Sequence, residues 1–193
     1  EEIQALTATQ IKAISTTQVG KFSAEQIAMF ATATDNNQIA SLSAAQIGAL
    51  SGDQIAGFTD TQMGKMSAAQ VGALTATQVP SLTQAQIGAL SSTQIAAIKT
   101  DVIDNLTTEQ VALFSTDTAS GSSQVQSLTT AQIVALGTNQ ISELSDVQLV
   151  ALTTSQVAAL ETADLQQITT AQIAKLTVSQ VAAFTTGQVD AFT

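Results

Sequence analysis

The sequence predicts an all-α solenoid, a superhelix of very short capped helices with one helix in each eight-residue repeat. Three observations predict it. The chain repeats with a period of eight residues over nearly its whole length, each repeat carries the signature of a helix start, and the charges within a repeat are ordered as they are along a helix. We therefore expect residues 1–193 to form a single octad-repeat solenoid.

The repeat is visible as an apolar anchor that recurs every eight residues. The consensus is Leu-[Ser/Thr]-x-x-Gln-[Ile/Val]-x-small, as in residues 82–89. Two intervals are longer, because Phe30 to Leu42 spans twelve residues and Phe114 to Leu128 spans fourteen. The remaining anchors are Leu6, Ile14, Phe22, Leu50, Phe58, Met66, Leu74, Leu82, Leu90, Ile98, Leu106, Leu136, Leu144, Leu152, Leu160, Ile168, Leu176, Phe184 and Phe192.

Each octad has the composition of a helix start. Ser or Thr followed three residues later by Gln is a capping box, and the apolar residues that flank it form a hydrophobic staple. Acidic residues such as Glu25 and Asp53 follow the cap, whereas Lys12 and Lys21 lie near the end of their units, as the helix dipole favours. Glycines also gather late in the unit, where we expect helices to stop. A β-strand explains none of this polarity.

One continuous helix cannot satisfy the period. Eight residues advance about 800°, so an apolar stripe drifts by roughly 80° per repeat. The chain must bend at every cap, giving helices of about six residues that are stable only when they stack on neighbours. Pro80 indicates a single tight turn or a local 3₁₀ helix. A short-period β-solenoid remains the alternative, because Ile, Val and Thr favour strands.

The composition excludes several function classes. The chain contains no Cys, His, Trp or Tyr, and all five basic residues are Lys. The common general bases, thiol nucleophiles and soft metal ligands are therefore missing, and we expect no enzyme, no cofactor and no metal site. A net charge of −10 disfavours nucleic acid, and no apolar run is long enough for membrane insertion. The start at Glu1-Glu2 without Met indicates a processed or excised piece.

The two long units contain small, polar, turn-forming residues near 31–37 and 115–123. We predict surface loops that are inserted without disturbing the register of the repeats. Such loops are the natural place for a binding site, and Asp35 and Asp117 suggest Ca²⁺. Because each loop offers only one carboxylate, a tolerated insertion is the favoured interpretation.

Two units depart from the consensus, where Val102 and Asp164 replace the glutamine. Asp101 and Asp104 could act as paired carboxylates, but drift in a redundant array explains them better. The glutamine column itself could form a binding ladder along one face. Its place in the capping box already supplies a structural role, so we predict capping. If Gln86 only caps, Gln86→Ala costs about 0.5–2 kcal/mol.

Two families resemble this pattern. Residues 106–112, Leu-Thr-Thr-Glu-Gln-Val-Ala, resemble the opening of a TAL-effector DNA-binding repeat, but only over its first helix, and the 34-residue period and base-reading loop are absent. Units such as 152–159, Leu-Thr-Thr-Ser-Gln-Val-Ala-Ala, are similar to the octad arrays of giant bacterial surface proteins labelled haem utilisation or adhesion. This second resemblance covers almost the whole chain and implies an extracellular stalk, adhesin or fibre.

We therefore expect a non-enzymatic structural element on a bacterial surface, forming a stalk, an adhesin shaft or a head-to-tail filament. The alternative is a module that binds a ligand or surface through its inserted loops. The expected partners are further copies of the chain or adjoining repeats of a longer one. The self-assembly contact is expected at the two ends, because together they form an octad that lacks one residue. The residues concerned are Glu1, Glu2, Ile3, Phe192 and Thr193.

Overall fold

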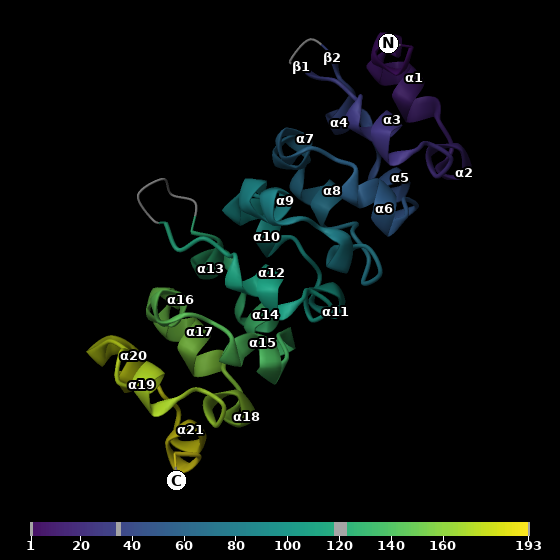
Figure 1. Ribbon diagram of the computed structural model, residues 1–193. Helices are drawn as coiled ribbons and strands as arrows, with labels where there is room; N and C mark the ends of the chain where they lie inside the picture. Colours follow the sequence, from purple (N-terminus) through teal and green to yellow (C-terminus); the bar gives the residue numbers. More distant parts are fainter. Residues whose placement is uncertain (1, 34–35, 118–122, 193) are drawn as a thin grey trace.

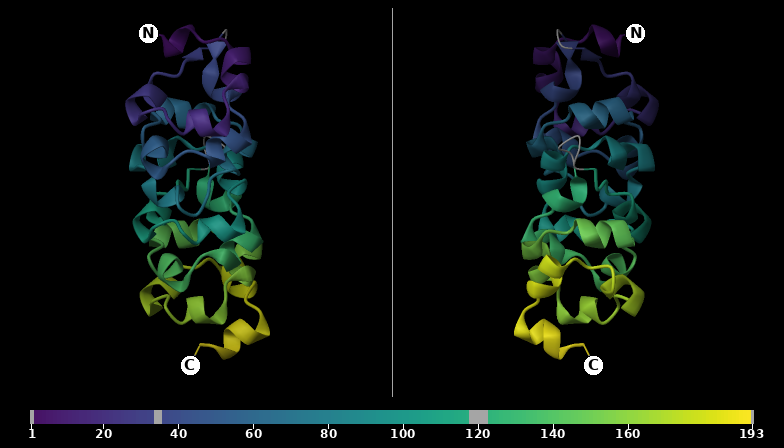
Figure 2. Two further views of the ribbon diagram at one scale, coloured as in Figure 1. Left: turned by 90° about the vertical axis from the view of Figure 1, so that its right-hand side faces the viewer. Right: turned by 90° about the vertical axis from the view of Figure 1, so that its left-hand side faces the viewer.

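The computed structural model describes residues 2–33, 36–117 and 123–192. Its short helices wind about one axis into a rod, with the N-terminus at one end and the C-terminus at the other (Figures 1 and 2). This confirms the all-α solenoid. The β-solenoid alternative is wrong, because within the described residues strands occur only in one hairpin, in which Thr32 pairs with Asn37 and Ala33 with Asn36.

The regular elements follow the octads in order, with one short helix in nearly every unit. Their bounds are η1 Ile3–Ala5, α1 Ala8–Ala13, α2 Thr16–Val19, α3 Ala24–Ala28, β1 Thr32–Ala33, β2 Asn36–Asn37, α4 Gln38–Ser41, α5 Ala44–Gly48, α6 Gly52–Ala56, α7 Asp60–Lys65, α8 Ala68–Val71, η2 Val79–Ser81, α9 Gln84–Ala89, α10 Ser92–Ala96, α11 Thr100–Ile103, α12 Thr108–Ala112, α13 Gln124–Ser127, α14 Thr130–Ala135, α15 Thr138–Ser142, α16 Asp146–Ala151, α17 Thr154–Ala159, α18 Thr162–Leu165, α19 Thr170–Ile173, α20 Val178–Ala182 and α21 Thr186–Asp190.

Helix α9 shows how one octad folds. The Gln86 amide N–H donates to Thr83 Oγ1 at 3.2 Å, and the Thr83 N–H donates to Gln86 Oε1 at 2.9 Å, which completes the capping box. The helix ends at Leu90, whose φ of −69° and ψ of 131° turn the chain into an extended link. Most other units repeat this geometry. The α-helices contain four to six residues, so several are shorter than the six expected.

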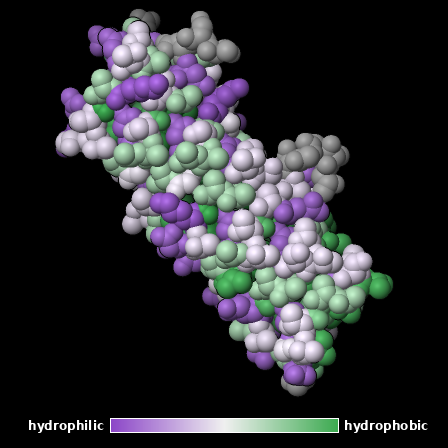
Figure 3. All heavy atoms as spheres, turned by 180° about the vertical axis from the view of Figure 1, so that it is seen from behind, coloured by the Kyte–Doolittle hydropathy of each residue, from purple (hydrophilic) through white to green (hydrophobic). Residues whose placement is uncertain are grey.

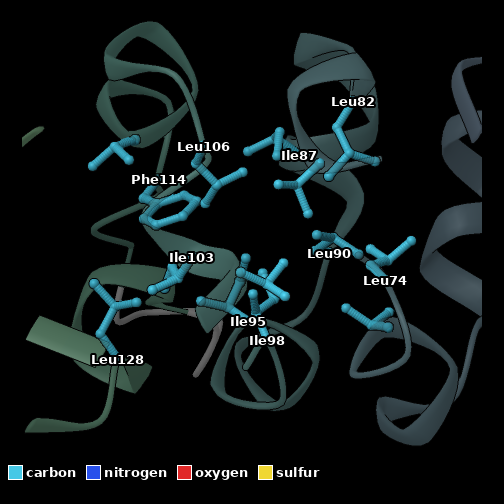
Figure 4. Packing of buried hydrophobic residues seen from close by; sticks show 14 of the residues in the cluster. Leu74, Leu82, Ile87, Leu90, Ile95, Ile98, Ile103, Leu106, Phe114 and Leu128 are labelled. Atoms are coloured by element: carbon cyan, nitrogen blue, oxygen red, sulfur yellow. The ribbon is translucent and has the colours of Figure 1, made fainter. Parts of the chain in front are cut away.

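The core is a continuous column of side chains along the axis of the rod (Figure 4). Between Ile27 and Ile168, the apolar residue after each glutamine and the next anchor are buried, as shown by Ile87 at 0% and Leu90 at 3% exposure. One cluster of buried residues extends from Ile11 to Ile168. Helices three units apart pack on each other, including α7 with α9, α10 with α13 and α14 with α17. Neighbouring turns therefore provide the burial that a single octad lacks.

The backbone conformation tests two local expectations, one for Pro80 and one for the glycines late in each unit. Pro80 lies in the 3₁₀ helix η2, which confirms the local 3₁₀ interpretation. The late glycines do not serve as left-handed helix ends, because Gly57 ends α6 with φ of −73°. Instead, a Cβ at Gly57 would lie 2.7 Å from Cα of Ala24 in the preceding turn. At this position the absence of a side chain allows close packing between turns.

Candidate functional site

The most extensive polar arrangement is the glutamine column, and Gln86 shows its geometry. Its Oε1 accepts the cap N–H described above, while its Nε2 donates to the carbonyls of Ile55 at 2.8 Å and Phe58 at 2.6 Å. These carbonyls come 31 and 28 residues earlier in the chain, in the preceding turn of the rod. The side chain is 1% exposed. A single amide thus caps one helix and joins it to the turn below.

The same double contact runs along almost the entire rod. Since 28 residues are three and a half octads, each superhelical turn contains between three and four units. Among the described residues, no buried side-chain nitrogen or oxygen lacks a hydrogen-bond partner. The glutamines that donate to an earlier turn are Gln38, Gln46, Gln54, Gln62, Gln70, Gln78, Gln86, Gln94, Gln110, Gln124, Gln132, Gln140, Gln148, Gln156, Gln172, Gln180 and Gln188.

Sequence reasoning predicted the cap, which is confirmed, and missed the contact between turns. The signal in the sequence that could have revealed this contact is the use of Gln instead of Glu. Glu serves a capping box as well as Gln does, yet the complete octads use Gln almost throughout. Only Gln also carries an N–H₂ group that can donate to carbonyls. The cost of 0.5–2 kcal/mol expected for Gln86→Ala therefore omits half of what this side chain does.

The two exceptional units change this contact in different ways. Val102 is 5% exposed and packs into the core, so its unit provides no amide to the preceding turn. Asp164 is 1% exposed and keeps the capping role, since its Oδ2 accepts the Glu161 N–H at 3.1 Å. Burial raises the pKa of Asp164, because desolvation disfavours its charged form. Asp101 and Asp104 lie on and just after α11, and Asp104 Oδ1 accepts a hydrogen bond from Asn105 Nδ2.

The inserted loops leave the column intact. Gln38 Oε1 accepts the Ala31 N–H at 2.7 Å across the first loop, and Gln124 Oε1 accepts the Ser115 N–H at 2.9 Å across the second. The inserted residues lie between the cap and the glutamine, so the repeat keeps its register, as expected. The first loop contains the β1–β2 hairpin. Asp35 lies outside the described residues.

The described residues that flank the two insertions lie on one side of the rod, and residues 34–35 and 118–122 are outside the described part of the chain. The β1–β2 hairpin and helix α13, which follows the second loop, lie on the same side in Figure 1. Helices α16 and α20 continue that side and carry the exposed side chains of Val147, Val150, Val178 and Val181. The C-terminal half is accordingly more apolar on its surface (Figure 3). This side is the candidate binding surface.

The expected self-assembly residues lie at the two ends of the rod. Glu2 is exposed, and the carbonyl of Ile3 accepts a hydrogen bond from Gln38 Nε2. Phe192 is 41% exposed, and its ring lies edge-on to Phe184 with 5.1 Å between centroids. Glu1 and Thr193 are outside the described residues. The structure therefore separates Glu2 and Ile3 from Phe192 by the full length of one molecule.

Across 2–33, 36–117 and 123–192, no three His, Cys, Asp or Glu residues come together as metal ligands. In the same part of the chain, no helix has the length and apolar character to cross a bilayer.

The comparison with protein families concerns the C-terminal third. The family model of the ALTTAQ repeat matches residues 125–161 and 157–193, in two tandem copies whose starts are 32 residues, or four octads, apart. The chain is a repeat protein. Residues 151–156, Ala-Leu-Thr-Thr-Ser-Gln, differ from the six letters of the family name at one position and include the cap and glutamine of α17. No curated protein matches the chain.

Proposed function

We propose that this repeat protein is a non-enzymatic shaft, an extracellular stalk or adhesin element on a bacterial surface. The observation that carries the proposal is the glutamine column. It joins successive turns through buried hydrogen bonds from Gln38 to Gln188, so a bend between turns must break contacts that water does not reach. A rod whose turns are joined in this way resists bending, so it holds its two ends at a fixed distance from each other.

The chemistry of the chain supports the same function. Without His, Cys or Arg there is little with which to catalyse a reaction or grip a phosphate. The absence of Cys also suits a protein that leaves the cell, because no thiol is present to oxidise. The net charge of −10 favours solubility and repels nucleic acid.

The test shortens the shaft without changing its ends. Deleting residues 50–105 removes 56 residues, or seven octads, and rejoins two units in register. We expect a folded rod that is about a third shorter in negative-stain images, with an unchanged helical spectrum by far-UV circular dichroism. On intact cells that make the parent protein, an antibody against this repeat array should bind without lysis. Labelling only after lysis would contradict the surface location.

A second candidate function is binding of a ligand or surface through the inserted loops, which is favoured by their position on one side of the rod beside exposed valines. Deleting residues 32–35 and 116–121 restores two regular octads and leaves the length of the shaft unchanged. Loss of cell attachment in this variant, with attachment retained after the 50–105 deletion, would favour binding over the shaft. The opposite pair of results would favour the shaft.

A further inference from the structure

The glutamine column is interrupted at Asp164, where a carboxyl group takes the place of the amide. Gln156, one octad earlier, donates from Nε2 to two carbonyls of the preceding turn, 31 and 28 residues before it. The same spacings place the carbonyls of Ile133 and Leu136 opposite Asp164, at the end of α14 and just before α15, on which α18 packs. All three residues are buried, with at most 3% of each exposed. A carboxyl group therefore faces two carbonyls where the neighbouring unit has an N–H₂ group.

The two carbonyls opposite Asp164 lack the donor that their equivalents have. Within the described residues, no hydrogen bond reaches the carbonyl oxygen of Ile133 or Leu136. The end of α14 differs accordingly, because the Leu136 N–H donates to the Gln132 carbonyl at 3.0 Å, four residues back. At the end of α9 the Leu90 N–H donates instead to the Ile87 carbonyl at 3.2 Å, three residues back. Buried acceptors without a donor cost free energy, so the contact between turns is incomplete at this point.

The charge on Asp164 determines whether this gap closes. Burial raises the pKa of the carboxyl most strongly, hydrogen bonds from the Glu161 N–H and the Thr138 hydroxyl lower it, and the negative charge of Glu161 raises it further. The other charged groups on or beside the helices packed against α18 are Glu143, which follows α15, and Asp190 in α21. Helix α14 carries no ionisable side chain. The described elements α14, α15, α18 and α21 contain no Lys, so none of them offsets a negative charge on Asp164.

We propose that α14, α15 and α18 form a joint in the rod, which is loose while Asp164 is ionised and closes when Asp164 takes up a proton from solvent. An ionised carboxylate has no proton to donate and is repelled by the carbonyl oxygens that it faces. A neutral carboxyl carries an O–H group that donates to the Leu136 carbonyl, as the glutamine N–H₂ does in other units. Because Asp is one methylene shorter than Gln, α18 must move toward α14 to form this bond.

The sign of the pH dependence follows from the two states of this joint. In the open joint water reaches the carboxyl, and its pKa returns to an ordinary value of about 4. In the closed joint the pKa of Asp164 is higher. The closed joint is therefore most stable below about pH 4, and this stability is lost as the pH rises through the pKa of the closed state. The joint adds to the proposed shaft a place where it bends at neutral pH, and depends on that proposal only in treating the glutamine column as what stiffens the rod.

Hydrogen exchange of backbone amides in the purified full chain, followed by mass spectrometry, measures the opening of this joint. Wild type is compared with Asp164→Asn, which removes the charge and keeps the length, and with Asp164→Gln, which restores the consensus. The control is Glu161→Gln, which removes an exposed charge from the same unit and leaves Asp164 in place. Variants are compared at the same pH, so the intrinsic pH dependence of exchange cancels. Peptides from α15 and α18 report on the joint, peptides from α9 and α10 are the reference, and far-UV circular dichroism verifies folding.

At pH 7 we expect α18 to exchange about tenfold faster in wild type and in the control than in Asp164→Asn or Asp164→Gln, with equal rates in α9 and α10. At pH 3.5 the difference in α18 should fall to within about twofold, because Asp164 is then protonated. Equal exchange of wild type and both Asp164 variants at pH 7 would overturn the proposal. So would a difference that persists at pH 3.5, or one that extends equally to α9 and α10. None of these results bears on whether the rod is displayed on cells, which the antibody experiment tests separately.

Discussion

The glutamine column provides its own control, because one type of side chain occurs with and without the contact to an earlier turn. Gln86 caps α9 and also binds the carbonyls of Ile55 and Phe58. Gln10 caps α1 in the same way and is exposed, and within the described residues its Nε2 donates to no earlier turn. Alanine at the two positions therefore separates capping from the joining of turns.

The expected magnitudes follow from which groups lose their partners. In Gln86→Ala the buried Phe58 carbonyl loses its partner and the Thr83 N–H loses its cap, while the Ile55 carbonyl keeps its bond to the Phe58 N–H. One orphaned buried carbonyl at about 1–3 kcal/mol and the lost cap at about 0.5–2 kcal/mol give a cost of about 1.5–5 kcal/mol. In Gln10→Ala water replaces the lost cap, so the cost is about 0.5–2 kcal/mol.

Urea unfolding followed by far-UV circular dichroism measures both costs. Because Gln86 lies in the middle of the rod, its loss should also reduce the cooperativity of unfolding, seen as a smaller dependence on urea. Gln86→Glu keeps the cap and should be as harmful as alanine at neutral pH, whereas Gln10→Glu should be nearly neutral. If Gln86→Ala costs no more than Gln10→Ala, the bonds between turns contribute nothing and the reasoning fails.

Three further outcomes are expected from thermal and chemical unfolding. Gly57→Ala should destabilise by about 1–3 kcal/mol, because its Cβ would meet the backbone of Ala24 in the preceding turn. Gly88→Ala, with open space around it, should stabilise by about 0.5–1 kcal/mol, and equal effects of the two changes would exclude close packing as the reason for Gly57. Burial raises the pKa of Asp164 in the folded state, so the protonated carboxyl stabilises the fold. This contribution is fully present below about pH 4 and is lost as the pH rises through the folded-state pKa of Asp164. Asp164→Asn should therefore raise the stability at pH 7 by about 1 kcal/mol and lose this advantage at pH 3, and an advantage independent of pH would contradict the assignment. Val102→Gln should restore the missing amide and raise the free energy of unfolding by about 0.5–1.5 kcal/mol. A fall in stability would show that the apolar packing of Val102 contributes more than the amide, and would contradict the interpretation of this unit as simply degenerate.

The octad period was sufficient to predict the fold, because capping is a local property of four or five consecutive residues. Thr83 and Gln86 determine where a helix begins whatever lies beyond them. The period also excluded a continuous helix by geometry alone. The short helix ending at residue 81 and the undisturbed register at the two insertions were predictable for the same reason.

The contact between turns was not predictable in the same way. It depends on the number of octads in a turn, which is set by the angles between successive helices and not by any one unit. Without that number, nothing in the sequence indicates that Gln86 faces Ile55 and Phe58. The close approach at Gly57 was missed for the same reason, since the atoms it meets belong to another turn.

The most direct test of the joined-turn architecture is proton exchange of the glutamine side-chain amides, measured by NMR at a concentration where the chain is monomeric. Hydrogen-bonded, buried N–H₂ groups exchange slowly, while exposed groups exchange at the rate of free glutamine. We predict strong protection for the mid-rod amides Gln70, Gln86 and Gln132 and none for Gln10, Gln18 and Gln26. Fast exchange at all six positions would contradict the account.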